Sequence, residues 1–150
     1  MLTKVTLAEL PKLGGSDLGG TDWLEVDQAR IDLFADATGD YQWIHVDPER
    51  ARHSPFGSTI AHGYLTLSMI LPLFEQLLQV EPVERKLNYG LNSVRFPAPV
   101  PVGAKIRLAA RLAEVIEIAG GVQIVVTATV ELQDSPKPAC VAELVLRFYG

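Results

Sequence analysis

The chain has 150 residues, of which 48% are hydrophobic and 21% are charged, and it carries a formal net charge of −5 at pH 7. This length and composition indicate one globular domain over residues 1–150, with enough apolar side chains for a substantial core. The acidic balance and the lack of a Lys/Arg cluster argue against a nucleic-acid partner. The single cysteine, Cys140, excludes an internal disulfide and favours a reducing compartment.

The N-terminal segment does not have the pattern of a secretory signal. Lys4 and Glu9 interrupt its apolar residues, and no small-residue cleavage site follows a continuous apolar stretch. The most apolar segment, residues 64–80, contains Pro72 and Glu75 and falls short of the ~20 apolar residues that span a bilayer. We therefore expect no membrane partner and a cytoplasmic location.

The first half of the chain is predicted to be mainly helical. Glycine-rich turns at residues 13–16 and 18–21 precede a candidate strand over residues 22–26. A helix is predicted over residues 27–38, because apolar residues recur there at helical spacing and Gly39 stands at the expected C-cap.

Two further helices are predicted downstream. Residues 47–49, Asp-Pro-Glu, are typical of an N-cap, a proline at the first helical position and an acidic first turn, so a short helix should begin shortly after His45. Residues 64–80 place apolar side chains on more than one face, which is typical of a helix enclosed by other structure. Pro72 should kink or divide this helix.

The second half of the chain is predicted to be β. Strands are indicated over residues 87–96, 106–112, 122–132 and 140–148 by alternating apolar and polar side chains. Gly120-Gly121 is a tight hairpin signal. The simplest architecture is an α+β fold in which an antiparallel sheet wraps around the long apolar helix. Because such a sheet has open edges, we expect a homodimer.

Asp40 and His45 form a candidate proton-transfer pair. They lie five residues apart between two helix signals, which limits their freedom, and His62-Gly63 opens the long apolar helix shortly afterwards. Asp40 alone could also be a turn residue after a glycine. A metal site is disfavoured, because His45, His53 and His62 are spaced by eight and nine residues, which matches no common zinc pattern.

Several motifs together resemble a known family. In order they are Phe-Ala-x-x-Thr-Gly-Asp at residues 34–40, Ile-His-x-Asp at 44–47, Pro-Phe-Gly at 55–57, Ile-Ala-His-Gly at 60–63, Asn-Tyr-Gly-Leu at 88–91 and Val-Arg-Phe-Pro-Ala-Pro-Val at 94–100. This collinear set resembles the MaoC-like, (R)-specific enoyl-CoA hydratase family. The resemblance covers most of the chain from about Val26 onward, and it implies a hotdog fold, a long central helix wrapped by an antiparallel β-sheet, usually assembled as a homodimer.

The resemblance also implies an activity and a set of site residues. The family adds water reversibly across the double bond of a trans-2-enoyl thioester to give the (R)-3-hydroxyacyl product. By resemblance, Asp40 and His45 are the catalytic pair, either of which can be the base, and the backbone N–H of Gly63 points at the thioester oxygen. Further candidates for substrate contact are Gln42, His62, Asn88 and Arg95, with a purely structural role open for Asn88 and Arg95. No cofactor is expected, because coenzyme A is part of the acyl-CoA substrate.

One departure from the family pattern is visible. Family members often have Asn-Pro between the catalytic residues, where this chain has Gln42-Trp43, so substrate shape or loop position could differ. Three alternative functions stay open: a 3-hydroxyacyl-carrier-protein dehydratase, an acyl-CoA thioesterase, and a non-enzymatic acyl-binding subunit. The histidine five residues after the aspartate favours hydration over hydrolysis.

Overall fold

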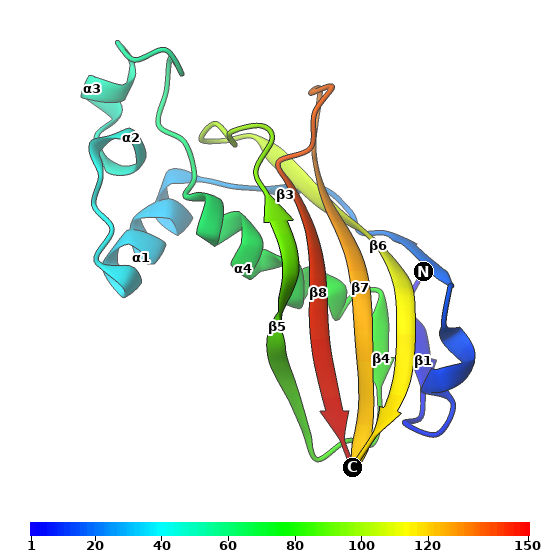
Figure 1. Ribbon diagram of the computed structural model, residues 1–150. Coiled ribbons are helices and arrows are strands. Elements are labelled where there is room, and N and C mark those ends of the chain that lie inside the picture. The colour runs from blue at the N-terminus through cyan, green and yellow to red at the C-terminus, as the bar shows by residue number, and fades with distance from the viewer.

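The computed structural model describes all 150 residues and shows a long antiparallel sheet that curves around one buried helix (Figure 1). In chain order the elements are β1 (Thr3–Val5), the 3-10 helix η1 (Leu10–Leu13), β2 (Asp17–Gly20), β3 (Leu24–Glu25), α1 (Gln28–Thr38), α2 (Trp43–Val46), α3 (Pro48–Ala51), α4 (Gly63–Phe74), β4 (Leu78–Val80), β5 (Arg85–Arg95), β6 (Lys105–Ile118), β7 (Gly121–Leu132) and β8 (Cys140–Tyr149).

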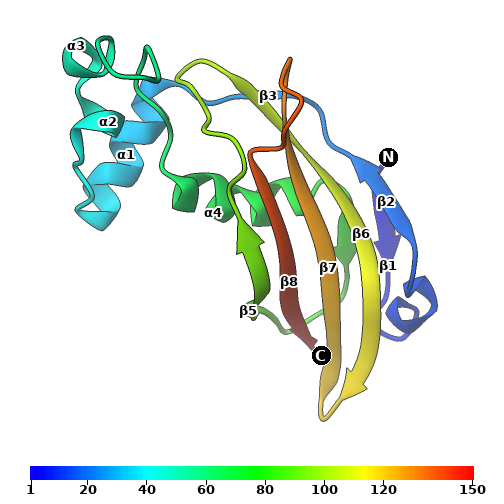
Figure 2. The same cartoon turned by 45° about the horizontal axis from the view of Figure 1, so that its top comes forward.

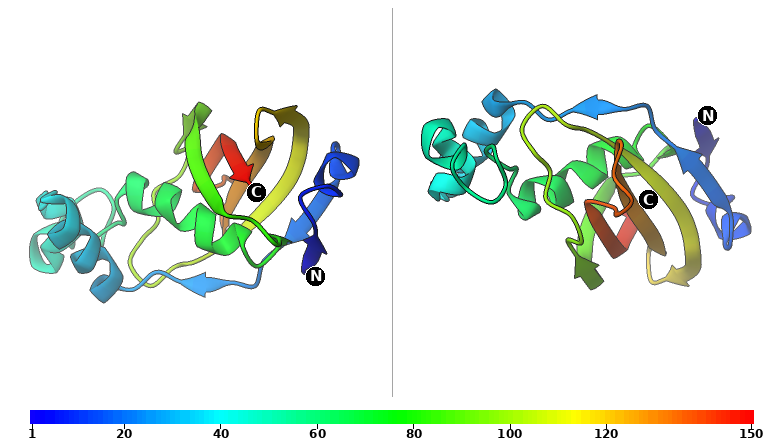
Figure 3. Two further views of the ribbon diagram at one scale, coloured as in Figure 1. Left: turned by 90° about the horizontal axis from the view of Figure 1, so that it is seen from below. Right: turned by 90° about the horizontal axis from the view of Figure 1, so that it is seen from above.

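The main sheet has the strand order β2-β6-β7-β8-β5, and β3 pairs with β6 beyond β2. All of its pairs are antiparallel. β6, β7 and β8 follow one another along the chain, whereas β5 joins the outer side of β8 and forms an edge. In a tilted view, and seen from below and above, the sheet bends around α4, which lies on its concave side (Figures 2 and 3). The predicted sheet around a central helix is therefore confirmed.

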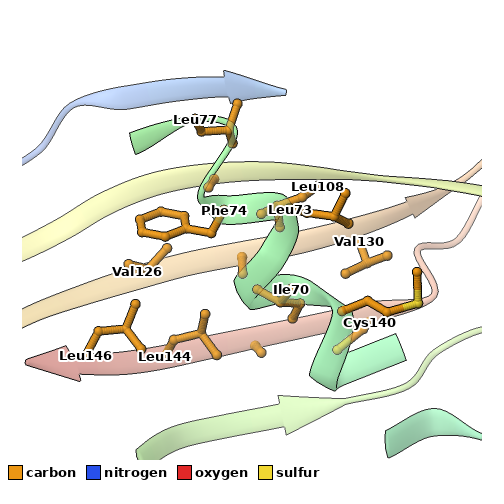
Figure 4. Packing of buried hydrophobic residues seen from close by; sticks show 14 of the residues in the cluster. Ile70, Leu73, Phe74, Leu77, Leu108, Val126, Val130, Cys140, Leu144 and Leu146 are labelled. Carbon is orange, nitrogen blue, oxygen red and sulfur yellow. The ribbon is translucent and has the colours of Figure 1, made fainter. Parts of the chain in front are cut away.

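The core lies between α4 and the concave face of the sheet (Figure 4). The predicted alternation of the strands places one set of apolar side chains inside, such as Leu108, Ile124 and Val130, each of which has no exposed surface. α4 is buried on more than one face, through Leu65, Thr66, Met69, Ile70, Leu73 and Phe74. None of the helices combines the length and the apolarity needed to cross a bilayer.

The helix predicted over residues 64–80 is shorter than expected. α4 ends at Phe74, two residues after Pro72, and residues 78–80 form β4 instead. β4 pairs in parallel with β1, so its backbone partner comes from the start of the chain. The prediction was wrong because a pattern within residues 64–80 cannot show a strand partner so distant in sequence.

Two predictions near the N-terminus also differ from the structure. Residues 18–20 belong to the short strand β2 rather than to a turn, and their glycines pair with β6 across a register shift between Asp17 and Gly19. Of the candidate strand over residues 22–26, only Leu24–Glu25 forms β3. Glycine enrichment here marks an irregular edge strand rather than a reversal of the chain.

Ile70 tests the contribution of α4 to the core. It has no exposed surface and packs between α4 and the strands of the sheet (Figure 4). Ile70→Ala should therefore lower the free energy of unfolding by about 2–5 kcal/mol, through lost burial and a residual cavity. Urea denaturation followed by circular dichroism measures this. Leu33→Ala on α1 is the matched control, because Leu33 is 69% exposed, and it should change the free energy by less than about 0.5 kcal/mol. Equal effects at both positions would contradict this account of the core.

Candidate active site

Helices α1, α2 and α3 gather beyond the sheet at the N-terminal end of α4 (Figure 1). α1 starts and ends as predicted. The Asp27 carboxylate accepts the backbone N–H of Arg30 at 2.9 Å, and Gly39 adopts a left-handed conformation (φ 80°) with its N–H donating to the Ala35 carbonyl at 2.8 Å. These caps fix the point at which the chain leaves α1, directly before Asp40.

His45 lies inside a helix that the sequence did not predict. It belongs to α2, a single turn over Trp43–Val46, and α3 follows at once. A four-residue helix is too short to show periodicity, and its N-cap residue, Gln42, makes no side-chain capping bond. The predicted cap of α3 is confirmed, because the Asp47 carboxylate accepts the N–H of Arg50 at 3.1 Å.

The imidazole of His45 is held in one orientation. It is 7% exposed, and its Nδ1 lies 2.7 Å from the carbonyl oxygen of Ile60. Because a carbonyl can only accept, Nδ1 carries the proton and Nε2 keeps its lone pair in the neutral ring. Burial lowers the pKa of His45, and the nearby His62 adds to this effect, whereas the Ile60 carbonyl and Asp40 oppose it. The neutral form is therefore favoured at pH 7.

Gln28 holds the backbone on which His45 sits. Its amide nitrogen donates to the His45 carbonyl at 2.8 Å and to the Asp32 carboxylate at 2.9 Å, while its amide oxygen accepts the Thr59 hydroxyl at 2.5 Å. Thr59 is 1% exposed and precedes Ile60. Sequence reasoning missed Gln28, because a neutral polar residue in a first helical turn carries no signal until its distant partners are known.

The structure brings Asp40, His45 and His62 together. A carboxylate oxygen of Asp40 and one ring nitrogen from each histidine lie within 4.8 Å of one another. His45 and His62 are buried, whereas Asp40 is exposed. The same atoms are near enough to hold one cation, which the sequence spacing did not predict. The two rings are stacked with an interplanar angle of 23°, and one nitrogen of each ring lies against a backbone carbonyl.

Gly63 is the first residue of α4, and it lines a hollow with Asp40, His45, His62, Tyr64 and Phe96. An adjoining cavity of about 320 Å³ also reaches His45, Gly63 and Phe96. No side chain caps this helix end, so the N–H of Gly63 has no partner within the helix and can donate to a negative oxygen. A Cβ at this position would lie 3.2 Å from the Phe96 ring. A side chain at this position would therefore crowd the Phe96 ring.

The remaining residues that the sequence suggested for substrate contact, Gln42, Arg95 and Asn88, do not line this hollow. Gln42 is exposed at the start of α2, and its N–H donates to the Asp40 carboxylate at 3.3 Å. Arg95 is exposed and donates to the carbonyl of Val94 at 2.7 Å. Asn88 lines a separate cavity with Leu71 and Phe74, near the other end of α4, so within one chain the fold does not bring it to the Asp40–His45 pair.

The fold and the site define a hotdog protein with an acid–imidazole pair at the start of its central helix. The (R)-hydratase from A. caviae has the same fold, with a TM-score of 0.72 and 23% identity over 89% of this chain and 94% of that one. The family model described as the MaoC like domain matches residues 12–135. The chain therefore belongs to the MaoC-like dehydratase domain family, and the hotdog fold that the resemblance implied is confirmed.

Two relatives match along nearly the whole chain. The 3-hydroxyacyl-thioester dehydratase Z of Mycobacterium tuberculosis is 50% identical over 149 residues, which is 99% of both chains. The nodulation protein N of Rhizobium leguminosarum bv. viciae is 44% identical over 146 residues, covering 95% of this chain and 90% of that protein. The match thus extends through the site and the sheet alike.

The buried position of His45 predicts a specific titration. Because burial lowers its pKa below the ordinary value of 6.5, the His45 ring should gain its proton only at a pH below 6.5. NMR titration of the ring carbon resonances measures this, and His45→Gln assigns the signal by removing it. A midpoint at or above 6.5 would show that the ring is more hydrated, or more strongly paired with Asp40, than its position indicates.

Proposed function

We propose that this protein is an (R)-specific enoyl-CoA hydratase, which adds water reversibly and syn to trans-2-enoyl-CoA and gives (R)-3-hydroxyacyl-CoA. The observation that carries the proposal is the convergence of the Asp40 carboxylate and the His45 imidazole beside the unpaired N–H of Gly63 in one hollow. Hydration of an enoyl thioester requires a base, a proton source and an oxyanion donor, and these groups supply all of them.

The geometry suggests how the steps are divided. The neutral His45 offers the Nε2 lone pair, because Nδ1–H is bonded to Ile60, and Nε2 takes a proton from water while the exposed Asp40 carboxylate orients that water. The water oxygen bonds to C3, the C2–C3 π electrons move toward the thioester, and Gly63 N–H stabilises the resulting negative oxygen. A proton from the pair then bonds to C2 and restores the thioester. The reverse sequence is the dehydration.

The relatives support the thioester substrate and the reaction class. Besides 3-hydroxyacyl-thioester dehydratase Z, the 3-hydroxybutyryl-CoA dehydratase of Methylorubrum extorquens is 34% identical over 114 residues, covering 73% of this chain and 70% of that protein. Both names describe removal of water from a 3-hydroxyacyl thioester. A thioester also matches the site, because its carbonyl can accept from Gly63 while its acyl chain enters the apolar cavity lined by Ile60, Phe96 and Val100.

We further propose that the protein acts as a homodimer. The edge strand β5 has 11 residues and pairs only with β8. Its Leu87, Tyr89 and Leu91 side chains are 44%, 59% and 41% exposed. A long edge strand whose outer side has no strand partner, and which exposes these apolar side chains, is a surface that a second copy would cover.

An assay of purified protein with trans-2-butenoyl-CoA tests the reaction class. Loss of enoyl absorbance with formation of (R)-3-hydroxybutyryl-CoA, without release of free thiol, is the expected result. Asp40→Asn and His45→Gln should each lower kcat by at least ~10², the usual contribution of a positioned acid or base. His53→Gln is the matched control, because His53 is exposed and outside the site. Thiol release without hydroxyacyl product would establish a thioesterase instead, and full turnover by either variant would refute that residue's role.

The oxyanion donor can be tested at Gly63. Gly63→Val should lower kcat by ~10², because the branched valine side chain would crowd the Phe96 ring and obstruct the N–H. Gly63→Ala should have a smaller effect. Steady-state kinetics measures both. Ser68→Ala, an exposed position on the same helix, serves as the control. An unchanged rate in Gly63→Val would place the oxyanion donor elsewhere.

A further inference from the structure

His62 contacts both members of the proposed catalytic pair. Its ring stacks on that of His45, with centroids 3.9 Å apart, and its Nε2 lies 3.0 Å from the backbone carbonyl oxygen of Asp40. The Phe34 ring packs against it at 4.9 Å in a tilted arrangement. His62 is 3% exposed, so its ring packs against the pair and has little surface with which to contact a substrate.

The backbone of His62 is tied to the first turn of α4. Its carbonyl accepts the N–H of Leu65 at 3.0 Å and that of Thr66 at 3.2 Å, and the next residue is Gly63. Any movement of the His62 ring relative to the helix therefore also moves the pair relative to the proposed oxyanion donor. One residue joins the acid, the imidazole and the helix end.

The hydrogen-bonding of the His62 ring selects one tautomer. The Asp40 carbonyl can only accept, so Nε2 carries the proton. Nδ1 is buried without a hydrogen-bond partner. In the Nε2–H tautomer only the Nδ1 lone pair is left unpaired, whereas the Nδ1–H tautomer would bury an unpaired N–H donor and would also lose the bond to the Asp40 carbonyl. A neutral imidazole has one N–H donor, and in the Nε2–H form this donor is bonded to the Asp40 carbonyl.

We propose that His62 is a positioning residue of the hydratase, resting on the proposed function. Its Nε2–H tautomer holds the backbone of Asp40 and the ring of His45 at a fixed distance from the first turn of α4, and it does not contact the substrate. This assignment replaces substrate contact as the role of His62.

The stacked arrangement also has an electrostatic consequence. Positive charge on one imidazole disfavours positive charge on the other, and Asp40 is the remaining titratable group that faces His45, since Gln28 of α1 and the Ile60 carbonyl are neutral. Removing the second imidazole should raise the pKa of His45. If neutral His45 accepts the proton, the acid limb of the kcat/KM profile should then move to higher pH.

Two variants separate the two contacts of the His62 ring. His62→Phe keeps an aromatic ring against His45 but loses the donor to Asp40, whereas His62→Gln keeps an N–H donor but loses the stack. We expect kcat to fall about tenfold in each and roughly a hundredfold in His62→Leu, the scale of loss from misplaced reacting groups. KM should change less than about threefold, because the lost contacts do not touch substrate. His53→Gln again controls for loss of a histidine.

The outcomes decide between positioning and other roles. An upward shift of the acid limb together with the kcat loss supports positioning. A raised KM with unchanged kcat would restore substrate contact and overturn the proposal, as would full activity in His62→Leu. Thermal unfolding identifies a variant that fails to fold, and in that case the two single-contact variants carry the test.

A measurement without turnover separates this inference from the proposed function. The ring nitrogen shifts of His62 in the unmodified protein report its tautomer, and the Nε2–H form is expected. A proton on Nδ1 would overturn the positioning role even in an active hydratase. Conversely, the Nε2–H form in a protein that does not hydrate enoyl-CoA would leave the contacts of His62 established, and the hydratase proposal would fail alone.

Discussion

The packing of α4 against the concave face of the sheet is the constraint on which the site depends. Because the helix is buried on more than one face, neither its rotation nor its position along the sheet can change without opening cavities in the core. Its N-terminal end, and therefore Gly63, is placed by the packing of buried side chains along the whole helix. The helix end at the site is therefore held rigid by the hydrophobic core rather than by the loops around it.

The helices α1–α3 and the segment that joins them to α4 are held by hydrogen bonds as well as by apolar packing, which includes the buried Ile31 of α1. The Ala61 N–H donates to the Val100 carbonyl at 2.8 Å, the Ile60 N–H donates to the Ile44 carbonyl at 3.0 Å, and Gln28 joins α1 to both α2 and Thr59. Hydrogen bonds are directional, so they set the orientation of His45 in a way that apolar packing alone would not. Apolar packing thus places the helix end, and hydrogen bonds with Ile60 and Gln28 fix the His45 ring and its backbone.

The parts of the fold that the sequence predicted are those set by local chemistry. The caps of α1 at Asp27 and Gly39 and the start of α3 at Asp47 depend on residues within one helical turn, and the long strands follow from alternation along a single segment. By contrast, β4 forms because residues 78–80 find a partner in β1, and that pairing has no local signal. The end of α4 was misjudged for the same reason.

The candidate site likewise divides into residues that local sequence patterns predict and residues that only tertiary contacts reveal. The spacing of Asp40 and His45 and the family resemblance predicted the pair and Gly63 as site residues, and the structure brings these three into one hollow. Neither Gln28 nor the support that His62 gives could be predicted, because each acts through tertiary contacts to backbone atoms. A sequence shows which side chains are available, but it does not show which carbonyl a side chain will meet.

The unequal burial of the pair follows from the different needs of its members. A neutral imidazole loses little when it is removed from water, provided that its N–H is bonded, and His45 meets that condition through Ile60. A carboxylate loses far more, and Asp40 is exposed at the surface of the hollow. Exchanging the two positions would bury a charge and leave the imidazole hydrated and less fixed. The fold therefore buries the imidazole, whose N–H is bonded, and leaves the carboxylate in contact with water.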